Sequence, residues 1–135
     1  MGVQKPLELI LARNLLASLS TPALLVGDDG ALLFHNEAAG ALLGRSFDET
    51  VAMPAADWTG AFGPFREDGE AMSYEEIPAT LALRRNRPFH GRFEIRAAGG
   101  RHREVAASAI PIVGLAGSSG AIVIFWPLDE QAGES

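Results

Sequence analysis

Apolar residues recur at three- and four-residue spacing between Pro6 and Leu19, with polar residues between them. This is the spacing of an amphipathic helix, and Pro6 suits its first turn. Leu9, Ala12, Leu16 and Ala17 add apolar surface beyond what one packing face requires. The helix therefore either packs on the domain's own sheet or associates with a second copy, and the pattern favours neither. Its stripe is made of Leu7, Ile10, Leu11, Leu15 and Leu19.

Two apolar runs, 23–26 and 31–35, flank the turn signal Gly27-Asp28-Asp29-Gly30. Apolar runs separated by an Asp-Gly turn predict a β-hairpin. Asn36 is a favourable N-cap for a short helix over 37–43, and Gly44 follows as a terminating glycine. A short helix is therefore expected directly after the hairpin.

Periodicity is lost from Ala55 to Met72, which predicts irregular backbone that carries aromatic core residues. Ser73 and Glu76 have the spacing of a capping box, but a helix that began there would place Pro78 where a backbone N–H is needed. The next helix is therefore expected to begin at Ile77 or Pro78 and to end at Arg85.

The last third of the chain predicts three strands. Alternation from Phe89 to Arg96 indicates a strand with one buried face, and 102–112 and 121–126 are the next two apolar segments. Gly99-Gly100 and the Gly-Ser loop 114–120 separate them. Segregated strands with helices between them predict an α+β domain: a five-stranded antiparallel sheet with short helices on one face and the N-terminal helix added to it.

The composition of the chain excludes several classes of function. The 135 residues include 17 acidic residues against 11 Lys and Arg, a net charge of −6, which argues against a nucleic-acid partner. Cysteine is absent, so disulfides, thiolate metal sites and Cys nucleophiles are excluded. No apolar run is long enough for a membrane span and no secretory leader is evident, so no membrane association and a cytoplasmic location are expected.

Candidate catalytic groups are few. His35, His90 and His102 lie on separate strands without the i, i+4 pairing of a metal site, so no metal ligand is assigned. Ser108 lies within a strand and not on a strained turn, which disfavours a serine nucleophile. We therefore expect no catalytic residue and no enzymatic activity. A small hydrolase or isomerase is the remote alternative.

The order of the elements and several local strings resemble a PAS domain, a sensory module of bacterial signalling proteins. The strings are Leu24–Gly30, Asn36–Ala39 closing on Leu43-Gly44, Asp68-Gly69 leading to Glu76 and Pro78, Ser108–Ile112, and Gly120–Phe125. The resemblance implies a PAS domain over 21–130, preceded by a dimerisation or capping helix at 1–20 and followed by a tail at 131–135.

In such domains small ligands sit between the helices and the sheet. The resemblance implies a mostly apolar pocket with a few orienting polar groups. The candidate ligand-binding residues are Trp58, Phe62, Phe65, Tyr74, Leu81, Arg84, Arg85, Phe93, Ile95, Ser108, Ile122 and Ile124. The cofactor is left open: without cysteine there is no Cys-linked flavin or chromophore, and the helix 77–85 lacks the histidine that usually ligates haem in these proteins. The alternative, that the aromatic residues simply fill the core, also stays open.

The implied function is a non-catalytic sensory and signal-transduction module. Its partners would be a second copy, bound through Leu7, Ile10, Leu11 and Leu15, and an effector such as a histidine kinase or a transcription regulator. A small-molecule ligand is a further candidate partner. The alternative is a pure protein–protein association domain with a filled core and no ligand.

Overall fold

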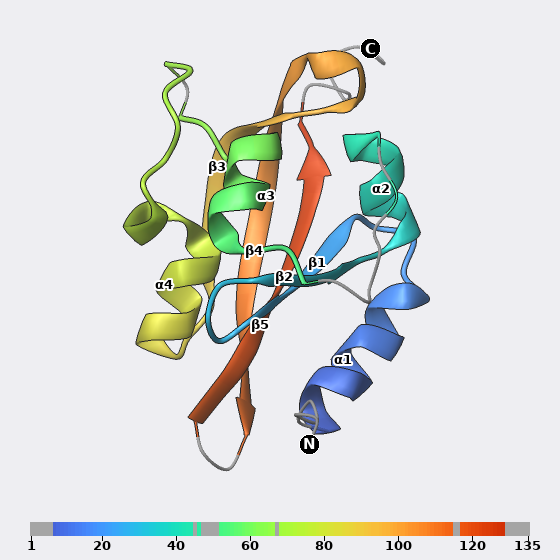
Figure 1. The fold of residues 1–135 in the computed structure, drawn as a ribbon, viewed down its shortest axis with the longest axis vertical. Helices are drawn as coiled ribbons and strands as arrows, with labels where there is room; N and C mark the ends of the chain where they lie inside the picture. Colours follow the sequence, from blue (N-terminus) through green and yellow to red (C-terminus); the bar gives the residue numbers. More distant parts are fainter. Residues whose placement is uncertain (1–6, 45, 47–51, 67, 115–116, 129–135) are drawn as a thin grey trace.

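The computed structural model describes residues 7–44, 46, 52–66, 68–114 and 117–128 (Figure 1). The α-helices are α1 (Leu7–Ala17), α2 (Glu37–Leu43), α3 (Ala55–Phe62) and α4 (Pro78–Arg85). The strands are β1 (Ala23–Gly27), β2 (Leu32–His35), β3 (Phe89–Arg96), β4 (His102–Gly114) and β5 (Gly117–Pro127). Short 3₁₀ turns occupy Tyr74–Glu76 and Ala98–Gly100. The expected tail 131–135 lies outside the described residues.

The five strands form one antiparallel sheet in the order β2-β1-β5-β4-β3. The last strand, β5, lies between β1 and β4, so the first and last strands pair with each other in the middle of the sheet. This arrangement confirms the α+β class, the antiparallel sheet and the hairpin expected at Gly27–Gly30. No helix in the described part of the chain is long and apolar enough to cross a membrane.

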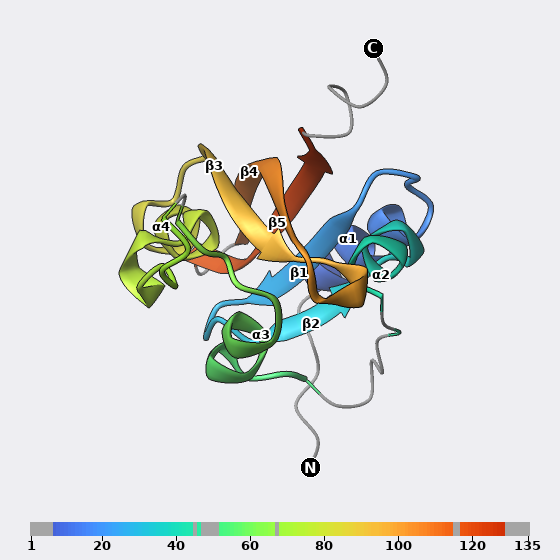
Figure 2. The same ribbon diagram turned by 90° about the horizontal axis from the view of Figure 1, so that it is seen from above.

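Each face of the sheet carries its own hydrophobic core, because successive strand residues point to opposite sides. On the inner face, residues of α2, α3 and α4 pack against the strands, for example Leu43, Trp58 and Ala82. On the outer face, α1 packs against Leu25 and Phe34. Figure 2 shows α1 beside β1, while α3 and α4 lie on the other side of the sheet.

The outer face of the sheet also decides how α1 is oriented. Leu9, Ala12 and Leu16 are buried against it. Four members of the stripe named from the sequence point the other way: Leu7 is 66% exposed, Ile10 44%, Leu11 58% and Leu15 58%. The fifth, Leu19, follows the helix and packs against the outer core. Both sets follow a helical period, so the pattern alone did not distinguish them.

Asn36 joins α1, β1 and α2 in the buried interior, where it is 1% exposed. Its side-chain amide donates hydrogen bonds to the carbonyl oxygens of Leu16 (3.1 Å) and Thr21 (2.8 Å), with a longer one to Leu19 (3.4 Å). Its side-chain oxygen accepts from the backbone N–H groups of Ala23 (3.1 Å) and Ala39 (2.9 Å). The predicted N-cap of α2 is therefore confirmed, and it also holds the end of α1.

The hairpin end of β4 and β5 touches helices on both sides of the sheet. Ser118 donates to the side-chain oxygen of Asn86, the C-cap residue of α4, at 2.6 Å. Its neighbour Ser119 donates to the carboxylate of Glu8 on α1. That hydrogen bond is the main reason why the pKa of Glu8 lies below its ordinary value; a backbone hydrogen bond adds to the shift.

One expectation about the middle of the chain was wrong. Residues 55–62 form a helix, α3, instead of irregular backbone. Trp58 and Phe62 lie four residues apart on its buried side, and Pro54 precedes its first turn. The capping box at Ser73 and Glu76 does form, around a single 3₁₀ turn, and α4 begins at Pro78 as expected.

Candidate functional site

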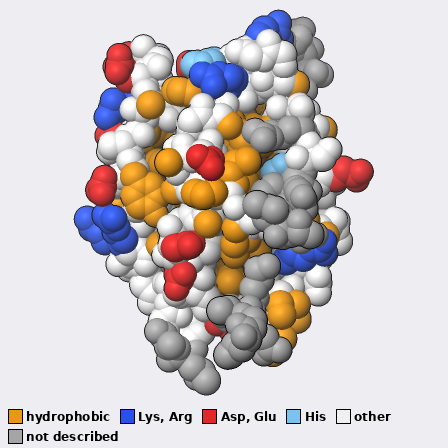
Figure 3. Space-filling model, in the orientation of Figure 1, with side chains coloured by type: hydrophobic (Ala, Val, Ile, Leu, Met, Phe, Trp, Pro, Cys, Tyr) orange, Lys and Arg blue, Asp and Glu red, His pale blue; other side chains and the backbone are white. Residues whose placement is uncertain are grey.

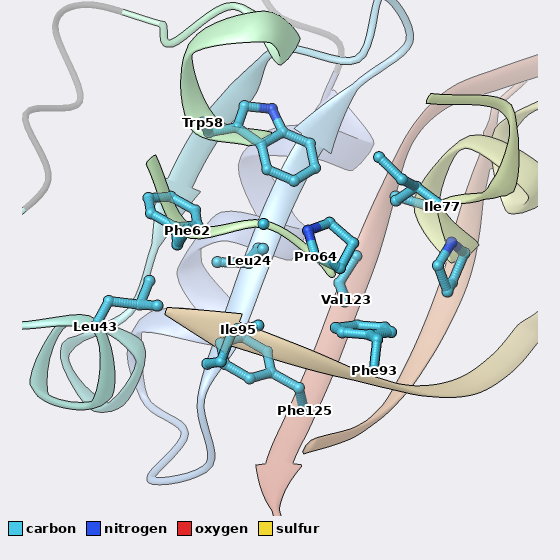
Figure 4. A pocket seen from close by; sticks show the side chains of 13 residues that line it. Leu24, Leu43, Trp58, Phe62, Pro64, Ile77, Phe93, Ile95, Val123 and Phe125 are labelled. Atoms are coloured by element: carbon cyan, nitrogen blue, oxygen red, sulfur yellow. The ribbon is translucent and has the colours of Figure 1, made fainter. Parts of the chain in front are cut away.

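A small cavity lies between the inner face of the sheet and the helices α3 and α4 (Figure 4). Its volume is about 40 Å³. The side chains that point into it come from β1, β3, β5 and the helical half of the chain, and almost all are hydrophobic. The lining residues are Leu24, Leu43, Trp58, Phe62, Gly63, Pro64, Ile77, Pro78, Ala79, Phe93, Ile95, Val123 and Phe125.

Trp58 covers one side of this cavity, which we call the core cavity, and a hydrogen bond to the β1–β2 turn fixes its position. Its indole N–H donates to the carbonyl oxygen of Gly30 at 2.9 Å. Gly30 has a φ of +87°, and a β-carbon there would collide with the hydroxyl of Tyr74. Glycine is therefore required at this turn for its conformation and for the close approach of Tyr74. Trp58 also stacks on Phe62, with ring centroids 6.3 Å apart.

Four of the predicted ligand-binding residues line the core cavity: Trp58, Phe62, Phe93 and Ile95. The sequence analysis missed others, among them Leu24 and the β5 residues Val123 and Phe125. An unbroken apolar run does not indicate which residues face which side. The buried and half-buried alternation of β5 resolves it only once the strand is placed in the sheet.

Ile122 and Ile124 lie on the other face of β5, against the core that α1 covers. Their placement near the cavity was wrong, because the strand's period of two sends Val123 and Phe125 inward instead. Ser108 shares the outer face, since it lies opposite Ile124 in the β4–β5 pairing. There its hydroxyl is 2.7 Å from Nδ1 of His90.

Phe65 is buried but does not line the core cavity. Its ring stacks on His102 with centroids 4.6 Å apart, and the guanidinium of Arg96 lies 5.2 Å from its centroid. Backbone pairing of Phe65 with Glu94 at the free edge of β3 holds the residue there. The structure thus assigns this aromatic ring to the edge of the sheet.

The expected polar groups of the pocket do not reach the core cavity. Arg84 lies over the ring of Tyr74 at 5.7 Å and 3.5 Å from the carboxylate of Glu75, with its side chain 55% exposed. Arg85 is exposed, and Leu81 is half-buried outside the lining. These four predicted residues, Tyr74, Leu81, Arg84 and Arg85, therefore form no part of the cavity.

The size and lining of the core cavity limit what it holds. Sites that enclose drug-sized ligands measure about 300–1,000 Å³, so a flavin or a haem does not fit the space between these side chains. No histidine lines the cavity, which leaves no axial ligand for a haem iron. Within the described residues, no group of three or more His, Asp or Glu is placed to hold a metal ion.

Comparison with solved structures identifies the architecture. The chain matches the PAS domain of BvgS from Bordetella pertussis at a TM-score of 0.60 and 16% identity, over 94% of this chain and 93% of that one. The chain has the PAS fold. Two further solved structures support this assignment. A PAS domain from Colwellia psychrerythraea matches at a TM-score of 0.62 and 15% identity, over 90% of this chain and 98% of that one. The PAS domain of nitrogen regulation protein NR(II) from Vibrio parahaemolyticus matches at a TM-score of 0.58 and 14% identity, over 87% of this chain and 98% of that one.

These identities show the PAS fold alone, and no protein-family model or curated protein matches the sequence. The resemblance seen in the sequence is therefore confirmed as a PAS domain in architecture. The cavity between helices and sheet lies where that resemblance placed a ligand, and only its size and the identity of its lining differ from the expectation.

Proposed function

We propose that the chain is a non-catalytic sensory and signal-transduction module that works by association with a second copy and with an effector. The observation that carries the proposal is the exposed stripe of α1. Its members Leu7, Leu11 and Leu15 are each more than half exposed, although α1 is held to the sheet at both ends. Large apolar residues gathered on one helix face mark a protein contact surface. Hydrophobic side chains are visible over α1 at the lower right of Figure 3.

The small size of the core cavity supports the form of this proposal in which the module binds no large ligand there. At about 40 Å³ with an apolar lining, the interior is nearly filled. Native mass spectrometry of the protein from several expression hosts is expected to show the polypeptide or its dimer with no added mass from a bound molecule. Retention of a bound molecule in every preparation would contradict the filled core and restore the ligand-binding alternative.

The effector of the proposed module is a histidine kinase or a transcription regulator. The similar solved structures support this choice, since they include a PAS domain described as that of a two-component sensor histidine kinase, matched at a TM-score of 0.52 and 18% identity. In this view a binding event changes how α4 packs on the sheet, and β5 transmits the change. Such an equilibrium shifts only by the difference in affinity for the two states.

The association is tested by placing two carboxylates in the exposed stripe. The double variant Leu11→Asp/Leu15→Asp is expected to sediment as a monomer while the wild type sediments as a dimer. Its circular dichroism should be unchanged, because neither side chain is part of the buried face of α1. A matched control, Ala41→Asp/Ala56→Asp, adds the same charge at exposed positions of α2 and α3 and should remain dimeric. A wild type that is monomeric at every concentration would refute self-association.

Enzymatic activity is not part of the proposal. Two histidine pairs in the described chain approach the groups of an acid–base site: His90 with Ser108 at 2.7 Å and His102 with the carboxylate of Glu94 at 3.2 Å. Simultaneous replacement of His35, His90 and His102 by glutamine provides the test. Loss of a measurable hydrolase or isomerase turnover in that variant would favour the enzymatic alternative.

A further inference from the structure

α1 covers only part of the outer face of the sheet. It packs over β1, β2 and the hairpin end of β4 and β5, where Ile112 and Ile122 contact the outer core. Figure 2 shows no described helix over β3 and the neighbouring part of β4 on that side. Residues of the outer face in this region are consequently open to solvent, including Ile110 (37% exposed) and Trp126 (42%).

This uncovered region contains a hollow with a volume of about 360 Å³. We call it the outer-face hollow; its lining residues are His90, Gly91, Arg92, Ala106, Ala107, Ser108 and Trp126. Two cross-strand rows build it: Arg92 pairs with Ala106, and Ala106 pairs with Trp126; His90 pairs with Ser108 in the next row. Small residues on the central strand β4 leave the space between the longer side chains of β3 and β5.

The two walls of the outer-face hollow differ in chemistry. On β5 the indole of Trp126 offers an aromatic surface. On β3, two strand spacings or about 10 Å away, Arg92 carries a guanidinium that makes no ion pair within the described chain. The floor carries the hydroxyl of Ser108, hydrogen-bonded to His90 at 2.7 Å.

We propose that the outer-face hollow binds an aromatic carboxylate, a ligand with one planar ring and one carboxylate arm. The ring stacks on Trp126, and the carboxylate accepts paired hydrogen bonds from the guanidinium of Arg92, the geometry that arginine favours. Ser108 supplies a further polar group on the floor. The volume falls within the range of about 300–1,000 Å³ for small-molecule sites, whereas the core cavity, at about 40 Å³ and apolar, accepts neither group.

The surroundings of the outer-face hollow set a modest affinity. It is open to solvent on one side, so both the ring and the ion pair remain partly hydrated and screened by salt. Glu104 lies two residues from Ala106 along β4, on the same face of the sheet, and its charge opposes a bound anion. We therefore expect millimolar binding. The affinity should fall as the salt concentration rises and should increase when Glu104 is neutralised.

The test uses indole-3-acetate as the probe and the two indole N–H signals in ¹H–¹⁵N NMR spectra of the full chain as the readout. Titration is expected to shift the Trp126 signal, assigned with a Trp126→Phe variant, in a saturable way. The buried Trp58 signal should stay in place. Indole-3-acetamide lacks the charge and acetate lacks the ring, so each is expected to bind at least fivefold more weakly.

Variants separate the ion pair from general surface binding. Arg92→Gln is expected to weaken indole-3-acetate at least fivefold, and Glu104→Gln to strengthen it. Arg85→Gln, the same change at an exposed arginine of α4, should leave the affinity unchanged. The proposal is overturned if the Trp126 signal does not move, if the acetamide binds as well as the acetate, if Arg92→Gln has no effect, or if Trp58 responds instead. It does not depend on self-association, which the α1 variants test separately.

Discussion

Replacing Asn36 by alanine removes a buried side chain that makes hydrogen bonds to three segments of the chain. The backbone N–H groups of Ala23 and Ala39 lose their acceptor, and both residues are fully buried. The carbonyl oxygens of Leu16 and Thr21 lose their donor. Loss of an N-cap costs about 1 kcal/mol, and a buried donor left unpaired costs about 1–3 kcal/mol.

We therefore expect Asn36→Ala to lower the free energy of unfolding by about 3–5 kcal/mol, a large part of the 5–15 kcal/mol typical of a domain. Urea denaturation followed by circular dichroism measures it. Asn14→Ala, at an exposed asparagine of α1, should stay within about 0.5 kcal/mol. A loss below about 1 kcal/mol for Asn36→Ala would refute the reasoning, because buried donors would then have found other partners.

Asn36→Asp sharpens the test because it keeps the shape of the side chain. One carboxylate oxygen still accepts from Ala39, but the other now faces the carbonyl oxygens of Leu16 and Thr21. Burial and this repulsion raise the pKa of the introduced carboxyl above its unfolded value of about 3.9. The native state then binds more protons, so the variant should gain stability relative to wild type as the pH falls from neutral towards 4. Stability equal to wild type at neutral pH would contradict this account.

Three further outcomes are expected. Gly30→Ala should destabilise the fold by more than Gly99→Ala, because both glycines have positive φ but only Gly30 faces an occupied space; equal losses in urea denaturation would contradict the clash. Phe93→Ala should cost about 3–5 kcal/mol, since the ring is 7% exposed, and a loss below about 1 kcal/mol would remove it from the core. The lowered pKa of Glu8 means that its hydrogen bond to Ser119 stabilises the fold above the ordinary value of 4.5 and is lost as the pH falls below it. The melting temperature of wild type should thus fall more steeply between pH 6 and pH 3 than that of Ser119→Ala, and parallel curves would exclude this contribution.

The strands and caps were predictable because local chemistry determines them. Alternation from Phe89 to Arg96 identified the buried face of β3, and Asn36 and Gly44 marked the ends of α2. α3 was missed because it is short and contains Gly60, which weakens its helical signal. The spacing of Trp58 and Phe62, together with Pro54, was the available clue.

The candidate sites were less predictable because they depend on which face each residue takes. Both leucine sets of α1 have a helical period, and only the position of the sheet decides which set is buried. In β5, a continuous apolar run concealed the alternation that sends Val123 inward and Ile124 outward. The outer-face hollow was missed because it arises from small residues on a neighbouring strand: Ala106 carries no signal of its own, and Ser108 was assigned to the other face of the sheet.

The paired serines at the end of the β4–β5 hairpin give α1 and α4 a common anchor. Ser118 and Ser119 are adjacent, yet one bonds to Asn86 and the other to Glu8, on helices that lie on opposite faces of the sheet. A displacement of either helix therefore acts on the same peptide unit, the one that joins Ser118 and Ser119. The two helices are thereby linked through neighbouring residues of one hairpin, so a change in the position of either helix bears on the same short stretch of β5.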